Sequence, residues 1–195
     1  MTALAMTVAR EPRRYQVNTT LGMAIFIGSW TMAFATLFIC FLFLRQREPV
    51  WPPVGVVLPS LPLAAAATAT LLASSALLHA AVNRGRRDAP GLAPLWGGAL
   101  LLGALFGVLQ TQLWLDVWRA GFHADAGNYF GLFYMLTWFH ALHVVCGLVA
   151  LTWVWAGILR GRIGVLRLSP AIGTALFWHF VDAVWVVLFL GIFVL

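Results

Sequence analysis

The chain has 195 residues and a mean hydropathy of +0.91, and only 9% of its residues are charged, against roughly 25% in a typical soluble domain. Because 62% of the residues are apolar, so few charges could not cover a soluble fold without leaving large hydrophobic patches exposed. These values exclude an ordinary soluble enzyme and a disordered chain. The net charge of +6 does not indicate nucleic-acid binding, because the arginines form short clusters between long apolar runs, as in membrane proteins.

Five apolar segments reach the length of about 20 residues that a helix needs to cross a bilayer. Four of them hold no charged residue, and the last holds one, Asp182. No segment shows the alternation of polar and apolar residues that a membrane β-barrel requires. The sequence therefore predicts an all-α polytopic membrane protein with a tail over residues 1–20 and a domain over residues 21–195. The predicted spans are about 21–44, 63–82, 92–115, 129–159 and 171–195.

The arginines are distributed unequally between the two sides of the predicted membrane domain. The N-terminal tail and the second and fourth loops hold nine of the 12 arginines, and the first and third loops hold three. Loops rich in arginine stay on the cytoplasmic side. We therefore expect the N-terminus to be cytoplasmic and the C-terminus to be periplasmic.

Asp182 lies near the middle of the last span, where an aspartate costs about 3 kcal/mol unless it faces protein or water. His179 and Trp185 lie three residues before and after it, on the same helix face. One interpretation is an acid that handles protons or binds a ligand. The other is a polar clasp between Asp182 and a histidine or hydroxyl on another span. The clasp is favoured because no second acid lies within a span to form a relay.

His140 and His143 share one face of the fourth predicted helix with Thr137 and Gly147. A haem would need two histidines on facing spans, and a metal ion would need further ligands nearby. The HxxH spacing alone provides neither a histidine on a facing span nor further metal ligands. Structural hydrogen bonding is therefore the favoured role of this pair, and we predict no metal site.

Other residues of the spans carry weaker expectations. His79 and Gln110 lie near span ends and are predicted to contact neighbouring helices or lipid headgroups. Trp30 is one of six tryptophans deep in the spans, which predict contact with lipid or a partner protein; the others are Trp138, Trp153, Trp155, Trp178 and Trp185. Cys40 and Cys146 lie in apolar runs without a CxxC pattern and predict two buried thiols.

Two segments resemble sequence blocks of one known family, subunit III of the haem-copper oxidases. Residues 177–185 read FWHFVDAVW and resemble the block in the last helix of that family. Residues 136–144 read LTWFHALHV and are similar to its HxxH block. Weaker similarities extend the resemblance over residues 21–195. Five spans match the short bacterial form, which lacks two N-terminal helices of the seven-span form.

The resemblance implies a non-catalytic, accessory subunit of a terminal oxidase in a bacterial inner membrane. Such an oxidase reduces dioxygen to water and couples this reaction to proton translocation. The subunit itself would hold no cofactor, because haem and copper belong to the catalytic subunit I, on which it docks beside the other oxidase subunits. The family also implies bound phospholipid. The motif residues that would then fix the helices against one another are His140, His143, Trp178, His179, Asp182 and Trp185.

The sequence departs from the family at two positions where glutamate is usual, now Trp30 and Leu113. Their loss argues for a scaffold over a proton carrier, and it leaves open a subunit III-like protein associated with nitric oxide reductase. A self-contained b-type cytochrome using the histidines is disfavoured, as is a small transporter, since no span is broken. The sequence does not distinguish quinol from cytochrome c as the electron donor.

Overall fold

The computed structural model describes residues 13–52, 55–56, 58–164 and 167–194. Within these residues the chain forms five long helices and no β-strand. The helices are α1 (Arg13–Arg47), α2 (Leu61–Arg86), α3 (Leu92–Arg119), α4 (Asn128–Leu159) and α5 (Ser169–Phe189), and a π-helical turn, η1 (Leu190–Val194), continues α5. Residues 1–12 of the predicted tail lie outside the described residues, and residues 13–20 form the first turns of α1.

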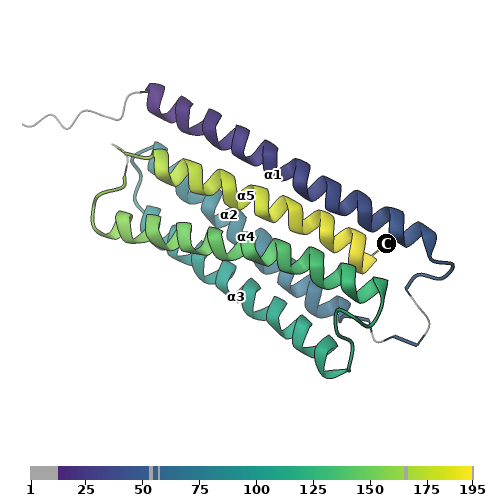
Figure 1. Ribbon diagram of the computed structural model, residues 1–195. Helices are drawn as coiled ribbons and strands as arrows, with labels where there is room; N and C mark the ends of the chain where they lie inside the picture. Colours follow the sequence, from purple (N-terminus) through teal and green to yellow (C-terminus); the bar gives the residue numbers. More distant parts are fainter. Residues whose placement is uncertain (1–12, 53–54, 57, 165–166, 195) are drawn as a thin grey trace, which may run out of the picture.

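All five helices are long and apolar enough to cross a membrane, so the prediction of an all-α protein with five membrane-spanning helices is confirmed. The helices extend beyond the predicted spans, because polar and charged residues continue the last turns. The first turn of α1 and the end of η1 lie at opposite ends of the bundle (Figure 1), as an odd number of spans requires. The cytoplasmic position of the N-terminus stays a prediction.

Local sequence signals set the helix ends. The Ser60 hydroxyl accepts a hydrogen bond from the Leu63 backbone N–H at 3.5 Å, and Pro62 lies in the first turn of α2, where its missing N–H is harmless. Gly91 precedes α3 with a φ of 104°, a left-handed conformation that glycine adopts without a steric penalty. The starts of α2 and α3 therefore each have a residue suited to that position.

Helices α2, α3, α4 and α5 form a closed four-helix bundle in which each helix contacts two neighbours. Helix α1 lies outside this bundle, along α5 and against α4 (Figure 1). The contacts between α2 and α3 are the most extensive, since alanines and glycines on both helices let the backbones approach closely. This arrangement places the last helix, α5, between α1, α2 and α4.

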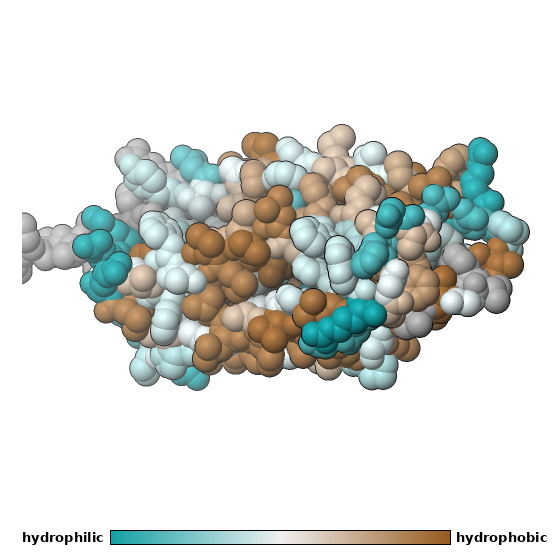
Figure 2. Space-filling view, turned by 60° about the horizontal axis from the view of Figure 1, so that its bottom comes forward, coloured by the Kyte–Doolittle hydropathy of each residue, from teal (hydrophilic) through white to brown (hydrophobic). Residues whose placement is uncertain are grey.

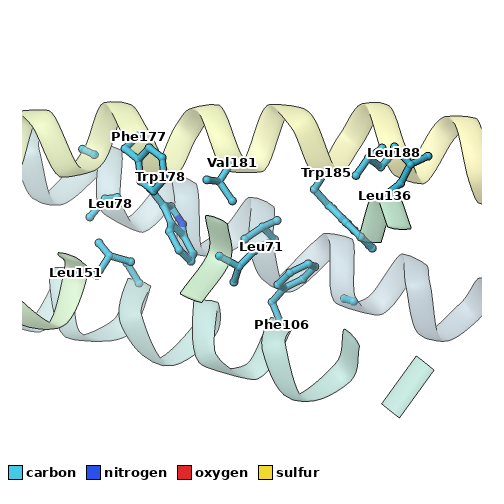
Figure 3. Close-up of a cluster of buried hydrophobic side chains, with 14 of the residues drawn as sticks. Leu71, Leu78, Phe106, Leu136, Leu151, Phe177, Trp178, Val181, Trp185 and Leu188 are labelled. Atoms are coloured by element: carbon cyan, nitrogen blue, oxygen red, sulfur yellow. The ribbon is translucent and has the colours of Figure 1, made fainter. Parts of the chain in front are cut away.

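Two tryptophans of α5 fill the centre of the bundle (Figure 3). Trp178 and Trp185 are both fully buried, so the expectation that they contact lipid or a partner is wrong for these two. The indole of Trp178 lies between two glycines, since a Cβ atom at Gly103 or at Gly147 would come within 2.6 Å of it. The ring of Phe106 packs edge-on against Trp185 with centroids 5.0 Å apart. The core of the bundle is therefore aromatic and closely fitted.

Large hydrophobic side chains cover the outside of the bundle, as lipid contact requires. In Figure 2 they occupy the middle of the visible face, and hydrophilic residues gather toward the two ends. Cys40 and Cys146 also lie on this outer surface, so the prediction that both thiols are buried is wrong. In a membrane-spanning helix the outward face is as apolar as the inward one, and an apolar run does not reveal which face a residue occupies.

Candidate functional site

The polar residues of α5 meet hydroxyl groups of α2. The Ser75 hydroxyl lies 2.5 Å from Nδ1 of His179, and the same hydroxyl interacts with the carboxylate of Asp182. One hydroxyl can accept from an imidazole N–H and donate to a carboxylate at the same time. His79 lies beside this group, with its ring centroid 6.1 Å from that of His179. These four side chains form what we call the α2–α5 clasp: Ser75, His79, His179 and Asp182.

Asp182 is 8% exposed, and its Oδ1 atom has no hydrogen-bond partner among the described residues. The clasp therefore removes the carboxylate from the lipid-facing surface without saturating it. The structure places Asp182 against a hydroxyl of another span, which is the arrangement of the clasp interpretation. The same geometry would also suit a group that takes up a proton, so contact alone does not assign its role.

The two buried tryptophans extend the contact between α5 and α2. The indole N–H of Trp178 donates to the Ser74 hydroxyl at 3.1 Å, and that of Trp185 donates to Thr68 Oγ1 at 2.9 Å. Sequence reasoning did not single out Thr68, Ser74 and Ser75. Thr68 and Ser75 are seven residues apart, which places them on the same side of a helix, and this spacing was the available signal. All four motif residues of α5 thus bind hydroxyls of one neighbouring helix.

The HxxH pair lies on α4, separate from the clasp. His140 is fully buried, contacts Trp185 with centroids 5.3 Å apart, and has no hydrogen-bond partner for either ring nitrogen among the described residues. His143 is 5% exposed, and its Nδ1 lies 2.8 Å from the Phe139 carbonyl oxygen in its own helix. No group of three or more His, Cys, Asp or Glu side chains in the described part of the chain could hold a metal ion.

Aromatic rings surround His143 and join α1 to α4. The ring of Trp30 lies 4.4 Å from that of His143, and Phe34 and Phe139 each lie 5.0 Å from it. Trp30, whose position is usually glutamate in the family that the sequence resembles, therefore presents an indole to the histidine. We call these four side chains the α1–α4 aromatic cluster. It gives α1 one of its few contacts with the bundle beyond α5.

Gln110 does not lie at the membrane surface. It is 2% exposed in the core, so the alternative of headgroup contact is wrong, and neither atom of its amide has a hydrogen-bond partner among the described residues. Leu113, at the second position where the family usually has glutamate, is fully buried one turn further along α3. His79, the exposed member of the clasp, contacts His179 on the neighbouring helix α5.

Two of the hollows on the surface of the described residues bear on ligand binding. The first is an apolar groove of about 360 Å³ between α1 and α5, whose lining includes Phe34, Phe38, Phe180 and Val184. The second, of about 250 Å³, lies where α4 ends and α5 begins, and its lining includes Arg160, Arg162 and Arg167 with Trp153. The first suits a hydrocarbon chain and the second suits an anionic group.

Comparison with known proteins identifies relatives over nearly the whole chain. The sequence profile of the family described as cytochrome c oxidase subunit III matches residues 11–195. A probable cytochrome c oxidase subunit 3 from Nocardia farcinica is 33% identical over 176 residues, which is 89% of this chain and 86% of that protein. Cytochrome c oxidase subunit 3 of Thermostichus vulcanus is 29% identical over 196 residues, 100% of this chain and 94% of that protein. A heme-copper oxidase subunit I+III from Aeropyrum pernix is 29% identical over 176 residues, 86% of this chain and 21% of that longer protein.

Proposed function

The chain belongs to the cytochrome c oxidase subunit III family, and we propose that it is an accessory subunit of a bacterial haem-copper terminal oxidase in the inner membrane. Its partners would be the catalytic subunit I, which holds the haem and copper, and the other oxidase subunits. The relative described as subunit I+III supports this partner, because one chain there carries both subunit names. The enzyme would reduce dioxygen to water with either quinol or cytochrome c as the electron donor.

The observation that carries the proposal is the inward direction of the family motif on α5. Trp178, His179, Asp182 and Trp185 all bind hydroxyl groups of α2 instead of pointing to a surface or a cofactor. Hydrogen bonds between membrane helices contribute about 0.6–2 kcal/mol each, so several along one interface make a firm connection. The motif therefore holds the helices of the bundle rigidly together. The rigid bundle in turn presents a preformed surface that stabilises the catalytic subunit.

The apolar groove between α1 and α5 is the proposed site of a phospholipid acyl chain. Its single hydroxyl, Thr31, donates to the Ile27 carbonyl of its own helix at 2.8 Å, so the groove offers little to a polar ligand. The arginine-lined hollow after α4 would hold the phosphate of a lipid on the proposed cytoplasmic side. A subunit that binds lipid in this way would also shield the catalytic subunit from direct bilayer contact.

We assign this subunit no part in moving protons. Both positions at which the family usually has glutamate, Trp30 and Leu113, are apolar here, and Trp30 packs against His143. The same substitutions leave open a second candidate, a subunit III-like protein that accompanies a nitric oxide reductase. The two candidates share the fold and differ in their partner.

The test is to purify the tagged chain from its native membrane in mild detergent and to identify the bound proteins. We expect a haem-copper oxidase subunit I, oxygen consumption with quinol or reduced cytochrome c, and a haem spectrum that disappears when the chain is separated from its partner. Co-purification of nitric oxide reductase subunits would favour the second candidate. A Soret band in the isolated chain would contradict both.

A further inference from the structure

Two polar side chains in the centre of the bundle are buried without a protein partner. Gln110 on α3 is 2% exposed and His140 on α4 is fully buried. Neither amide atom of Gln110 and neither ring nitrogen of His140 has a hydrogen-bond partner among the described residues. Native proteins leave few buried polar groups unpaired, and ordered water supplies the partner when no protein group does.

The register of the two antiparallel helices brings this pair to one level. The ring of Phe106 lies 6.1 Å from that of His140, and the Trp114 indole N–H donates to Thr137 Oγ1 at 3.0 Å. Gln110 lies one turn after Phe106 on the same buried stripe of α3 and one turn before the half-buried Trp114. His140 lies one turn after Thr137 on α4. Gln110 therefore faces the segment of α4 that holds His140.

The polar groups around the pair are already occupied. The Thr137 hydroxyl donates to a backbone carbonyl one turn earlier in α4 at 2.7 Å, while it accepts from Trp114. The indole N–H of Trp185, which stacks near His140, donates to Thr68. Neither neighbour has its donor free to turn toward the amide or the imidazole. An ordered water molecule can supply the partner that these two neighbours do not.

The remaining wall beside Gln110 is made of small side chains. The Ser74 hydroxyl donates to the Ala99 carbonyl at 2.7 Å and fixes α2 against α3. Continuing this antiparallel register places Ala64, which is fully buried, close to the level of Gln110, and Ala67, also fully buried, at the level of Phe106. Small side chains on α2 at this level are compatible with a bound water molecule, which needs little space.

We propose that an ordered water molecule binds between Gln110 and His140 and bridges α3 to α4. The amide NH₂ of Gln110 donates to the water oxygen, and the water donates to the ring nitrogen of His140 that carries no hydrogen. A second water hydrogen remains for the Gln110 carbonyl oxygen or a further water. The bridge gives the HxxH motif a role in holding α3 to α4, in addition to the α1–α4 aromatic cluster around His143.

The direct test is a cryo-EM map of the membrane complex that contains the unaltered chain, at a resolution that shows ordered water. We expect a density peak within hydrogen-bond distance, about 2.7–3.2 Å, of both the Gln110 amide and a ring nitrogen of His140. A direct hydrogen bond between the two side chains would overturn the proposal. So would a well-resolved core without such a peak.

A double-mutant cycle tests the bridge independently. Gln110→Leu and His140→Leu each leave the opposite group with a half-bonded water, so each should lower the Tm of the purified chain by several degrees. The double variant removes both polar groups, and its Tm should fall by clearly less than the sum of the two single effects. Gln112→Leu is the matched control, because Gln112 is exposed and bonds only Asp116 on its own helix. Strictly additive losses would overturn the bridge, and the map of the unaltered chain decides the question if a variant does not assemble.

Discussion

The close fit of Trp178 between two glycines makes a sharp prediction for Gly103→Ala. A Cβ atom at Gly103 would lie 2.6 Å from Cζ2 of Trp178, whereas ordinary contacts begin at 3.4 Å, so the indole would have to move by about 0.8 Å. It has little freedom to do so, because Gly147 of α4 lies against its other atoms and its N–H is bonded to Ser74. The substitution therefore forces a backbone shift between α3 and α5.

The expected magnitude follows from two opposing effects. Overpacking a closely fitted core costs about 1–3 kcal/mol, and the clamped indole at Gly103 places this site in the upper half of that range. Replacing glycine by alanine inside a helix gains about 1 kcal/mol. The net loss is about 1–2 kcal/mol of unfolding free energy, and the Tm should fall by about 2–8 °C at roughly 2–4 °C per kcal/mol.

The assay is thermal unfolding of the purified chain in detergent, followed by circular dichroism, with Gly107→Ala as the control. Gly107 lies one turn further along α3, and a Cβ atom there would meet nothing within 4 Å. The Tm of the Gly107→Ala variant should therefore stay constant or rise. Adding Trp178→Phe to Gly103→Ala should recover part of the loss, because the smaller ring vacates the contested space. Equal effects of the two alanine substitutions would refute the steric reasoning.

Three further outcomes are expected. Asp182→Ala removes the carboxylate that interacts with the Ser75 hydroxyl, so it should reduce the yield of assembled complex while complexes that do assemble keep normal electron transfer; an assembled, stable complex that has lost only proton pumping would contradict this role. Trp30→Ala removes aromatic contacts worth about 0.5–1.5 kcal/mol each, so hydrogen exchange should quicken in α1 but not in α2–α5; uniform quickening would show that α1 is integral to the bundle. Val184→Trp fills the groove between α1 and α5, and native mass spectrometry should then find fewer bound phospholipids; an unchanged lipid count would place the lipid elsewhere.

The number of spans could be predicted because it depends only on the length and apolarity of segments, which the sequence states directly. The side of each helix that faces the bundle could not. Residues 129–159 of α4 are uncharged and mostly apolar, yet Trp138 is 60% exposed while Leu136 is fully buried. In water such faces differ in polarity, but lipid is as apolar as a protein core, so the periodic signal disappears. The errors at Cys40 and Cys146 have the same cause.

The sequence identified the charged residue of the candidate site but not the hydroxyl group that it contacts. Asp182 was identifiable because a charge in a membrane span is rare and demands a partner. Its partner Ser75 was not, since serine and threonine are common in membrane helices and bond their own backbone, as Thr31 and Thr152 do here. For Gln110 the sequence left open contact with a neighbouring helix or with lipid headgroups, because this residue lies near the end of the predicted span. The structure shows that α3 continues to Arg119, which puts Gln110 well inside the helix.

The hydroxyl groups on either side of the α2–α5 clasp bear on whether Asp182 could belong to a proton path. A relay along α2 would need hydroxyls that can accept a proton on one side and release one on the other. Thr68 donates to the Ala64 carbonyl and accepts from an indole N–H, and Ser74 donates to the Ala99 carbonyl and accepts from another. Indole N–H groups only donate, so they pass no proton onward. The groups from Thr68 to His79 also extend over only about 16 Å of a hydrocarbon core about 30 Å thick. The same tryptophans that join α5 to α2 therefore close the route, which favours a clasp over a relay at Asp182.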